Sequence, residues 1–329
     1  MTRGSWWRWA RPLGGAVILG VLLARLGTDA FVEGVRATDA RTLLLGAAVA
    51  AVTTTCAAWR WRLVARVLDA ELSMPSAVAA CYRAQFLNVT LPGGVLGDVD
   101  RGVHHGREVD DVGRGLRGVA WERASGQVVL AVVTVAALLQ GRVLTTTAVL
   151  VPVAVLAVAG LVLLGVARAG RGTRRGTGVG ARAARVAAAD ARALLSPVAL
   201  AGIAVASLAV LAGHVATFLL AARTVGVRMP VVELVPLALL VLLVAAVPLN
   251  LAGWGPREGA AAWVFAAAGV GAAQGLAVSV AYGVIVLVAT LPGAVLLLAG
   301  RSRRSSSPSG DRPARTGPTA DTREVTAHG

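Results

Sequence analysis

Apolar residues occur along this chain in stretches close to 20 residues long, and these stretches lack the polar–apolar alternation of a half-buried strand. About 20 consecutive apolar residues are needed to cross the hydrocarbon core of a membrane as a helix. Alternating strands would instead be needed for a transmembrane barrel. The fold class predicted is therefore all-α, a polytopic membrane helical bundle. Its six full spans are expected over residues 13–27, 42–64, 119–140, 143–167, 198–222 and 274–300.

Two further apolar segments are interrupted by glycine and proline. Residues 75–91 run into "LPGGVLGDVDR", and residues 231–251 run into "GWGPREG" before a shorter apolar piece at 256–270. Glycine and proline free backbone polar groups that lipid cannot satisfy, so broken backbone at membrane depth is tolerated only inside protein or along a wet cavity. Both segments are predicted to be re-entrant, broken-helix elements. For residues 231–270, two full crossings fit the pattern equally well.

The arginines set the expected topology. The formal net charge is +15, and all basic residues are arginine. They concentrate in the interfacial N-terminus, residues 1–12, and in a loop at 168–196 that holds seven arginines and one aspartate. Arginine-rich segments stay in the cytoplasm, so an even number of crossings separates these two. The segment at 75–91 must then turn back rather than cross.

The second interrupted segment would enter from the outside, and two such elements form an inverted repeat of the transporter type. The membrane domain is expected to cover residues 13–300. The Ser/Pro/Gly-rich tail, residues 301–329, is expected to be disordered and cytoplasmic, like the N-terminus.

Residue types exclude several chemistries. The absence of lysine removes the P-loop and Schiff-base mechanisms. Nucleic acid is not an expected partner, because the arginines flank apolar spans. Cys56 and Cys81 lack metal-ligand spacing and are expected to be small core residues. The pair His104 and His105 is expected in a solvated loop, and His214 is expected to hydrogen-bond a neighbouring helix. No catalytic residue, metal or cofactor is predicted.

The two interruptions share a pattern: Leu-Asn, then a Gly/Pro break, then an acidic residue and an arginine. Asn88 is followed by Asp98 and Arg101, and Asn250 is followed by Arg257 and Glu258. A charge at the centre of a membrane costs roughly 2.5–3.5 kcal/mol on insertion scales, so these groups would need partners or water. That predicts a hydrophilic cleft between apolar helices. The residues alone leave open a second interpretation, in which they are ordinary solvated loop residues.

Three stretches together, "YRAQFLNVTLPGGVLGDVDRG", "AWERASG" and "PLNLAGWGPREG", resemble the lysylphosphatidylglycerol synthase transmembrane-region family of flippase-like membrane proteins. The resemblance spans roughly residues 10–300. It rests on a Pro-Gly followed by Gly-Asp and Arg, on a Glu-Arg pair, and on Gly-x-Gly-x-Arg-Glu. With the two asparagines, the candidate lipid-headgroup cleft is lined by Asn88, Pro92, Gly93, Gly97, Asp98, Arg101, Glu122, Arg123, Asn250, Gly253, Gly255, Arg257 and Glu258.

The resemblance implies lipid transport in the plasma membrane. In two-part relatives, this region moves aminoacylated phosphatidylglycerol outward, and a separate soluble domain synthesises it. That domain is not expected here, so transport is expected rather than catalysis. The implied partners are an anionic or aminoacylated phospholipid or a lipid-linked sugar, and a separate synthase or glycosyltransferase. Arg101, Arg123 and Arg257 would hold a phosphate, and the carboxylates would hold the arginines or a cationic headgroup.

Two other functions remain open. The first is a membrane enzyme that acts on lipid-linked substrates and uses Asp98 or Glu258 as an acid or base. The second is an accessory subunit or scaffold that transports nothing.

Overall fold

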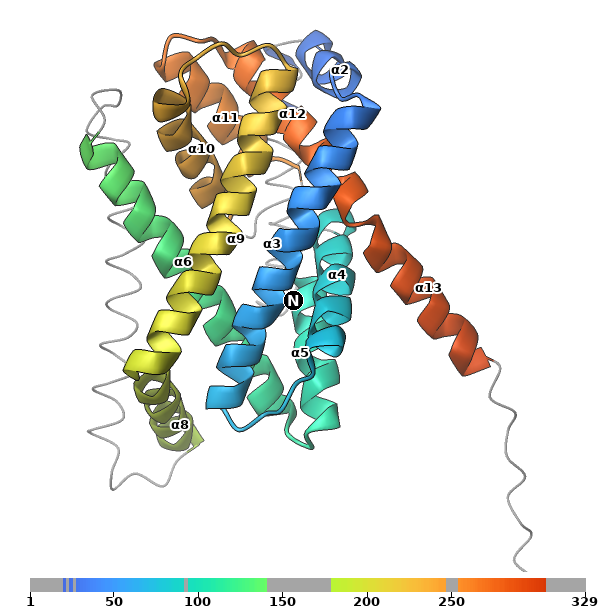
Figure 1. Cartoon of the computed structure of the whole chain (residues 1–329), viewed down its shortest axis with the longest axis vertical. Coiled ribbons are helices and arrows are strands. Elements are labelled where there is room, and N and C mark those ends of the chain that lie inside the picture. Colours follow the sequence, from blue (N-terminus) through green and yellow to red (C-terminus); the bar gives the residue numbers. More distant parts are fainter. Residues whose placement is uncertain are drawn as a thin grey trace, which may run out of the picture.

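The computed structural model describes residues 20–21, 24–25, 28–91, 94–140, 179–246 and 254–305, and each regular element in these ranges is a helix (Figure 1). The span expected at 143–167 and most of that expected at 13–27 lie outside the described residues, as do residues 1–12, 168–178 and 306–329. Four of the predicted site residues also lie outside them, namely Pro92, Gly93, Asn250 and Gly253.

Four helical segments are long and apolar enough to cross a membrane: α3 (Ala40–Val67), α6 (Val112–Gln140), α9 (Pro197–Thr224) and Ala272–Ala299. They confirm the spans predicted at 42–64, 119–140, 198–222 and 274–300. Helices α3 and α9 lie side by side along much of their length (Figure 1). Their contact is close because Gly213 of α9 packs against Thr53 of α3 and leaves no room for a Cβ.

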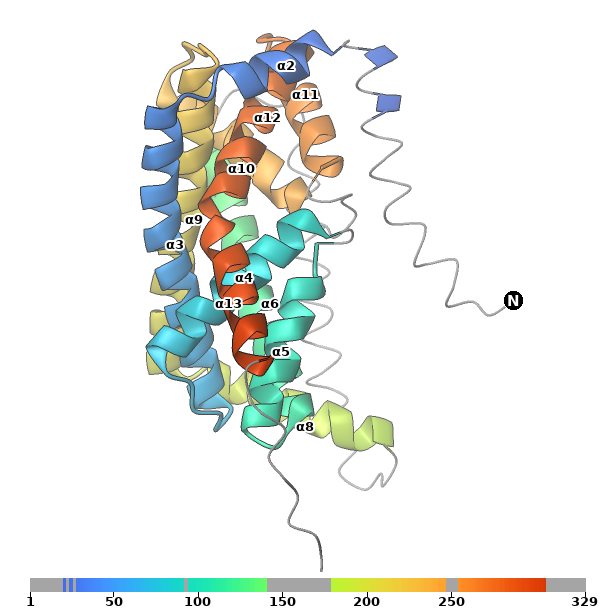
Figure 2. The same ribbon diagram turned by 90° about the vertical axis from the view of Figure 1, so that its right-hand side faces the viewer.

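The first interrupted segment forms a hairpin of α4 (Met74–Thr90) and α5 (Leu96–Glu108). Helix α4 starts at the end of the bundle where α3 finishes and rises towards the middle, and α5 returns to the same end (Figure 2). Gly97 packs on the backbone of Ala84 without space for a side chain, so the two arms contact closely. The predicted re-entrant element is therefore present.

The prediction that His104 and His105 lie in a solvated loop is wrong. Both lie on α5, where His104 is exposed and His105 is buried against the edge of the Trp61 ring. The sequence provides little indication of this helix, because α5 is short, polar on one face and preceded by a glycine-rich turn.

The second interrupted segment forms a hairpin of α10 (Val231–Ala245) and α11 (Pro256–Ala267). Helix α10 starts at the end of the bundle where α9 finishes, and α11 returns to that end, where α12 (Ala272–Ala289) begins (Figure 1). Two full crossings are thereby excluded for residues 231–270. The two hairpins enter the bundle from opposite ends, which is the inverted arrangement that the sequence predicts.

The span predicted at 274–300 is not straight. Helix α12 ends at Ala289, and α13 (Leu291–Ser305) continues in a different direction and packs against α4, where Gly293 meets the backbone of Tyr82 (Figure 2). Pro292 explains the break, because its nitrogen has no hydrogen with which to continue the helical ladder of α12.

Two shorter helices lie at opposite ends of the bundle. Helix α2 (Asp29–Arg36) lies at the end where α3 begins (Figure 1). Helix α8 (Val179–Leu194) lies at the other end, in part of the sequence expected to be a loop, and the ion pair of its Asp190 with Arg117 (3.0 Å) joins it to α6.

Candidate functional site

A cavity of about 310 Å³ lies inside the bundle at the level where both hairpins turn. Its wall includes Asn88 and Gly94 from the first turn and Ala245 and Pro256 from either side of the second. The charged side chains that line it are Arg60, Asp98, Arg101, Glu122, Arg123 and Arg257. The two hairpins, more than 120 residues apart in the chain, thus meet at one partly enclosed space.

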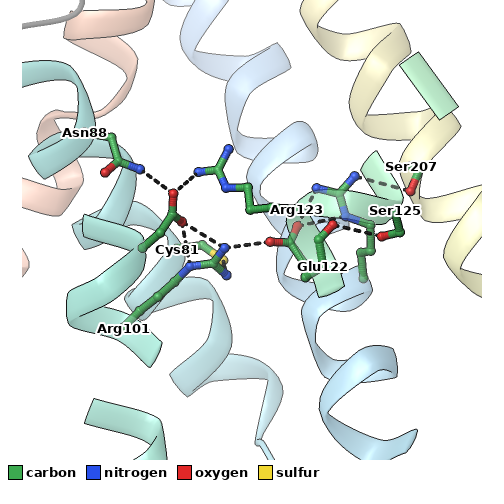
Figure 3. A network of polar contacts seen from close by, with 9 residues as sticks. Cys81, Asn88, Arg101, Glu122, Arg123, Ser125 and Ser207 are labelled. Carbon is green, nitrogen blue, oxygen red and sulfur yellow. Dashed lines mark hydrogen bonds and ion pairs between the residues drawn. The ribbon is translucent and has the colours of Figure 1, made fainter. Parts of the chain in front are cut away.

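Glu122 is the centre of the first charged cluster, which consists of Arg60, Asp98, Arg101, Glu122 and Arg123. It is buried on α6 and accepts hydrogen bonds from Arg60 of α3 (Nε, 2.8 Å) and Arg101 of α5 (Nη2, 2.6 Å) (Figure 3). A buried carboxylate between two guanidinium groups is balanced by opposite charge and charge-assisted hydrogen bonds. Glu122 therefore holds three helices together.

Arg101 has no freedom to bind a ligand. Its side chain is only 5% exposed, and its Nε donates to Asp98 (3.0 Å). The guanidinium carbon lies 4.7 Å from the centre of the Trp61 ring, and Nη1 lies 3.8 Å from the sulfur of Cys81. Because carboxylates and an aromatic face surround it, Arg101 is a fixed part of the wall. The expectation that Arg101 binds phosphate is therefore not supported by its contacts.

Arg123 is the accessible member of the first charged cluster. One of its terminal nitrogens pairs with Asp98 (2.6 Å), and its side chain is 48% exposed (Figure 3). Its other nitrogens have no hydrogen-bond partner among the described residues. An arginine held at one end by a carboxylate keeps the rest of its donor fork available for an anion.

Asn88 joins the two arms of the first hairpin. Its side-chain oxygen accepts from the backbone N–H of Gly97 (2.8 Å), and its side-chain nitrogen donates to Asp98 (3.0 Å). The amide thus satisfies a donor at the start of α5 and also orients the carboxylate that holds Arg123.

Glu258 has the corresponding role in the second hairpin. It is completely buried, and one oxygen accepts from the backbone N–H of Gly255 (2.7 Å), which satisfies a donor at the start of α11. The other oxygen accepts from Arg257 (2.6 Å) and from the hydroxyl of Ser279 on α12 (3.0 Å). Gly255 has φ +125°, a conformation that strains any residue with a side chain. The second charged cluster is the set Arg257, Glu258 and Ser279.

Arg257 lies between aromatic rings. Its guanidinium carbon is 5.6 Å from the centre of the Trp254 ring and 5.2 Å from that of the Tyr282 ring, distances at which a cation is attracted to a ring face. Its side chain is 12% exposed. The Tyr282 hydroxyl and His214 Nδ1 are 3.1 Å apart and join α12 to α9, which confirms the helix–helix hydrogen bond predicted for His214.

The candidate site residues named from the sequence do not include Arg60 and Trp61. A stretch such as "WRWRLVAR" at the end of a span is typical of the membrane interface, but here both residues are buried, and Arg60 pairs with Glu122. A signal was present, since Gly46, Thr53 and Arg60 are seven residues apart and so share one face of α3 with small residues. An arginine on such a face points to the interior of a bundle.

The site as a whole favours an anion. Across the two clusters, four arginines face three carboxylates, which leaves an excess of one positive charge. No group of His, Cys, Asp and Glu side chains suited to a metal ion occurs among the described residues, and both cysteines are free. A partly enclosed cavity with excess positive charge, an accessible guanidinium at Arg123 and a second guanidinium, Arg257, in its wall can bind a phosphate or carboxylate and its attached group.

Comparison with known proteins identifies the family. The family model described as "Lysylphosphatidylglycerol synthase TM region" matches residues 8–293. Among curated proteins and solved structures, none matches the chain. The matched range contains both hairpins, both charged clusters, three of the long apolar helices and most of the fourth. The chain is therefore an integral membrane protein that belongs to the lysylphosphatidylglycerol synthase transmembrane-region family.

Proposed function

We propose that the protein moves an anionic lipid across the membrane, and that the headgroup passes through the central cavity. The observation that carries this proposal is the convergence of two hairpins from opposite ends of the bundle on one cavity lined by Arg123 and Arg257. In inverted-repeat transporters, broken helices meet at a substrate site in the same way.

The arginines divide into two kinds. Arg60 and Arg101 are buried and saturated by carboxylates, so they position the wall. Arg123 and Arg257 keep donors on the cavity side and bind the phosphate, while Asp98 and Glu258 hold them in place. Each binding arginine belongs to a different half of the inverted arrangement. The headgroup can therefore be transferred between them as one hairpin moves against the other.

The size of the cavity fits a headgroup and not a whole lipid. Its volume of about 310 Å³ is near the lower limit for small-molecule pockets, whose volumes are roughly 300–1,000 Å³. The acyl chains then remain in an apolar environment throughout. The chemistry fits a phospholipid, including an aminoacylated one, or a lipid-linked sugar phosphate, made by a separate synthase or glycosyltransferase.

The membrane potential can drive this transport. The end of the bundle that holds the arginine-bearing α8 is cytoplasmic by the positive-inside rule, which places the first hairpin's entry there. An anionic headgroup that moves outward across an inside-negative plasma membrane gains about 2.3 kcal/mol per charge per 100 mV. ATP hydrolysis is therefore not required.

Catalysis fits the geometry less well. Glu258 is completely buried and accepts from three donors, and Asp98 accepts from Asn88, Arg101 and Arg123. A carboxylate whose oxygens are occupied by this many protein donors has little room for a hydrogen bond to a reacting group, which a general acid or base requires. We therefore assign both residues to positioning the arginines.

The test is lipid translocation in proteoliposomes. The purified protein is reconstituted into vesicles of phosphatidylcholine and phosphatidylglycerol with a trace of fluorescent phosphatidylglycerol, and dithionite reports which leaflet holds the probe. Wild-type vesicles should expose the inner-leaflet probe faster than empty vesicles. Arg123→Ala and Arg257→Ala should each lose this activity. Arg123→Ala should keep the thermal stability of the wild type, because Arg123 is half exposed. Arg257→Ala should lose some stability, because it leaves the buried Glu258 without its ion-pair partner, so its rate is compared per folded protein.

Arg66→Ala is the matched control, because Arg66 is an exposed arginine of α3 that does not line the cavity. Its translocation rate should equal that of the wild type. Equal rates for all four proteins would refute the role of the cavity arginines, and no activity in any of them would refute lipid transport of this probe.

A further inference from the structure

A second cavity of about 240 Å³ lies beside the first, between the tip of α4, the start of α11 and the middle of α12. Three residues, Val89, Arg257 and Val286, line both cavities, so the two spaces adjoin at the guanidinium of Arg257. The complete lining of the second cavity is Val89, Thr90, Trp254, Arg257, Gly283, Val286 and Leu287.

The chemistry of the second cavity contrasts with that of the first. Arg257 is its only charged lining residue within the described part of the chain. Thr90 is already satisfied, because its hydroxyl donates to the carbonyl of Phe86 (2.7 Å). Aliphatic and aromatic groups make up the rest of the wall. One of its lining residues, Leu287, is 36% exposed at the surface of the bundle.

Gly283 makes the junction of the two cavities possible. A Cβ at this position would lie 2.5 Å from Nη2 of Arg257 and 3.2 Å from the Trp254 ring. Any larger residue at position 283 would therefore displace the guanidinium of Arg257. With glycine there, Arg257 can face the polar cavity on one side and the apolar cavity on the other.

We propose that the second cavity is a lateral portal that holds an acyl chain of the lipid whose phosphate Arg257 binds. The inference rests on the lipid-transport function proposed above and assigns the two parts of the ligand to separate spaces. The headgroup occupies the charged cavity, and the chain leaves through the apolar one to the surrounding lipid at Leu287. A chain gains little by moving from lipid to apolar protein walls. Its place here is therefore fixed by the phosphate at Arg257.

The test is photo-crosslinking in vesicles. The full-length protein is reconstituted with phosphatidic acid that bears a diazirine on one acyl chain. After illumination, mass spectrometry measures crosslinks at Val286, inside the portal, relative to Val205, an exposed residue of α9 that lines neither cavity. The expected result is an enrichment at Val286 that is lost in Arg257→Ala. It should also be lost when diazirine-bearing diacylglycerol, which has no phosphate, replaces phosphatidic acid.

Two variants block or spare the portal. Leu287→Trp adds a large group at the exposed mouth and should abolish the enrichment at Val286. Leu208→Trp makes the same change at an exposed position of α9 and should leave it intact. Crosslinking at Val286 no greater than at Val205, or unchanged in Leu287→Trp, would overturn the portal. If lipid translocation in proteoliposomes persists in that case, the transport function still stands.

Discussion

The two hairpins share a topology and differ in chemistry. The first, α4–α5, carries two members of a five-residue charged cluster, and its return helix α5 buries an aspartate, an arginine and a histidine. In the second, α10 buries only apolar residues and α11 contributes one ion pair. Each turn satisfies a backbone N–H at the start of its return helix, with Asn88 in the first hairpin and Glu258 in the second.

This difference shows that the two hairpins are inverted copies in topology but have different roles in the protein. The first charged cluster ties α3, α5 and α6 together through Glu122, so its ion pairs hold the bundle. The second presents one arginine at the junction of two cavities. Loss of the ion pairs of the first charged cluster should therefore reduce stability most, and loss of the arginine in the second cluster should reduce transport most.

Glu122→Gln tests the first half of that comparison and should have the largest effect. Removing one partner of a buried ion pair leaves uncompensated charge and costs about 3–5 kcal/mol, and here two arginines lose their partner. Denaturant unfolding in mixed micelles measures the loss. Glu108→Gln, at an exposed carboxylate of α5, is the control and should unfold like the wild type. A wild-type midpoint for Glu122→Gln would contradict the structural role of the cluster.

Alanine substitutions at Gly94 and Gly255, one in each hairpin turn, should have the next largest effects. Gly255 has φ +125°, and Gly255→Ala forces strain worth about 1–3 kcal/mol. Gly94 has φ +61°, which an L-residue can adopt at a cost of about 1–2 kcal/mol. Unfolding midpoints should therefore fall further for Gly255→Ala. Transport should also fall further for Gly255→Ala, because Gly255 caps the helix that carries Arg257. The reverse order would show that the first turn is the more constrained.

Asn88→Ala removes the link between the arms of the first hairpin. The backbone N–H of Gly97 and the carboxylate of Asp98 each lose a hydrogen bond, at about 1 kcal/mol each. The unfolding midpoint should fall by less than for Glu122→Gln. Translocation should also slow, because Asp98 holds Arg123. Unchanged translocation would separate Asn88 from the positioning of Arg123.

Tyr282→Phe should have the smallest effect. The hydrogen bond to His214 is lost, and such bonds between membrane helices are worth about 0.6 kcal/mol on average. The ring that faces Arg257 remains. Stability should fall slightly, and fluorescent-lipid translocation should match the wild type. A large loss of transport would show that the hydroxyl itself contacts the headgroup.

The sequence by itself determined four of the spans and the two broken segments, and it left open whether residues 231–270 form a hairpin or two crossings. Hydropathy marks a span because lipid accepts only continuous apolar helix, and arginine marks the cytoplasmic side. Of the charges beside the two breaks, Asp98, Arg101 and Arg257 line one cavity, and Glu258 holds Arg257 from outside that lining. These features are local in the chain, so a pattern of residues can reveal them.

Only the tertiary structure decided which charges pair and which remain accessible. Arg60 and Glu122 are 62 residues apart, and nothing in either local pattern selects the other. Arg101 and Arg123 look alike in the sequence, yet packing buries the first among carboxylates and leaves the second open to the cavity. The junction at Gly283 likewise depends on how α11 approaches α12. Ion-pair partners and cavities are set by distances between helices, which the order of residues along a single helix does not contain.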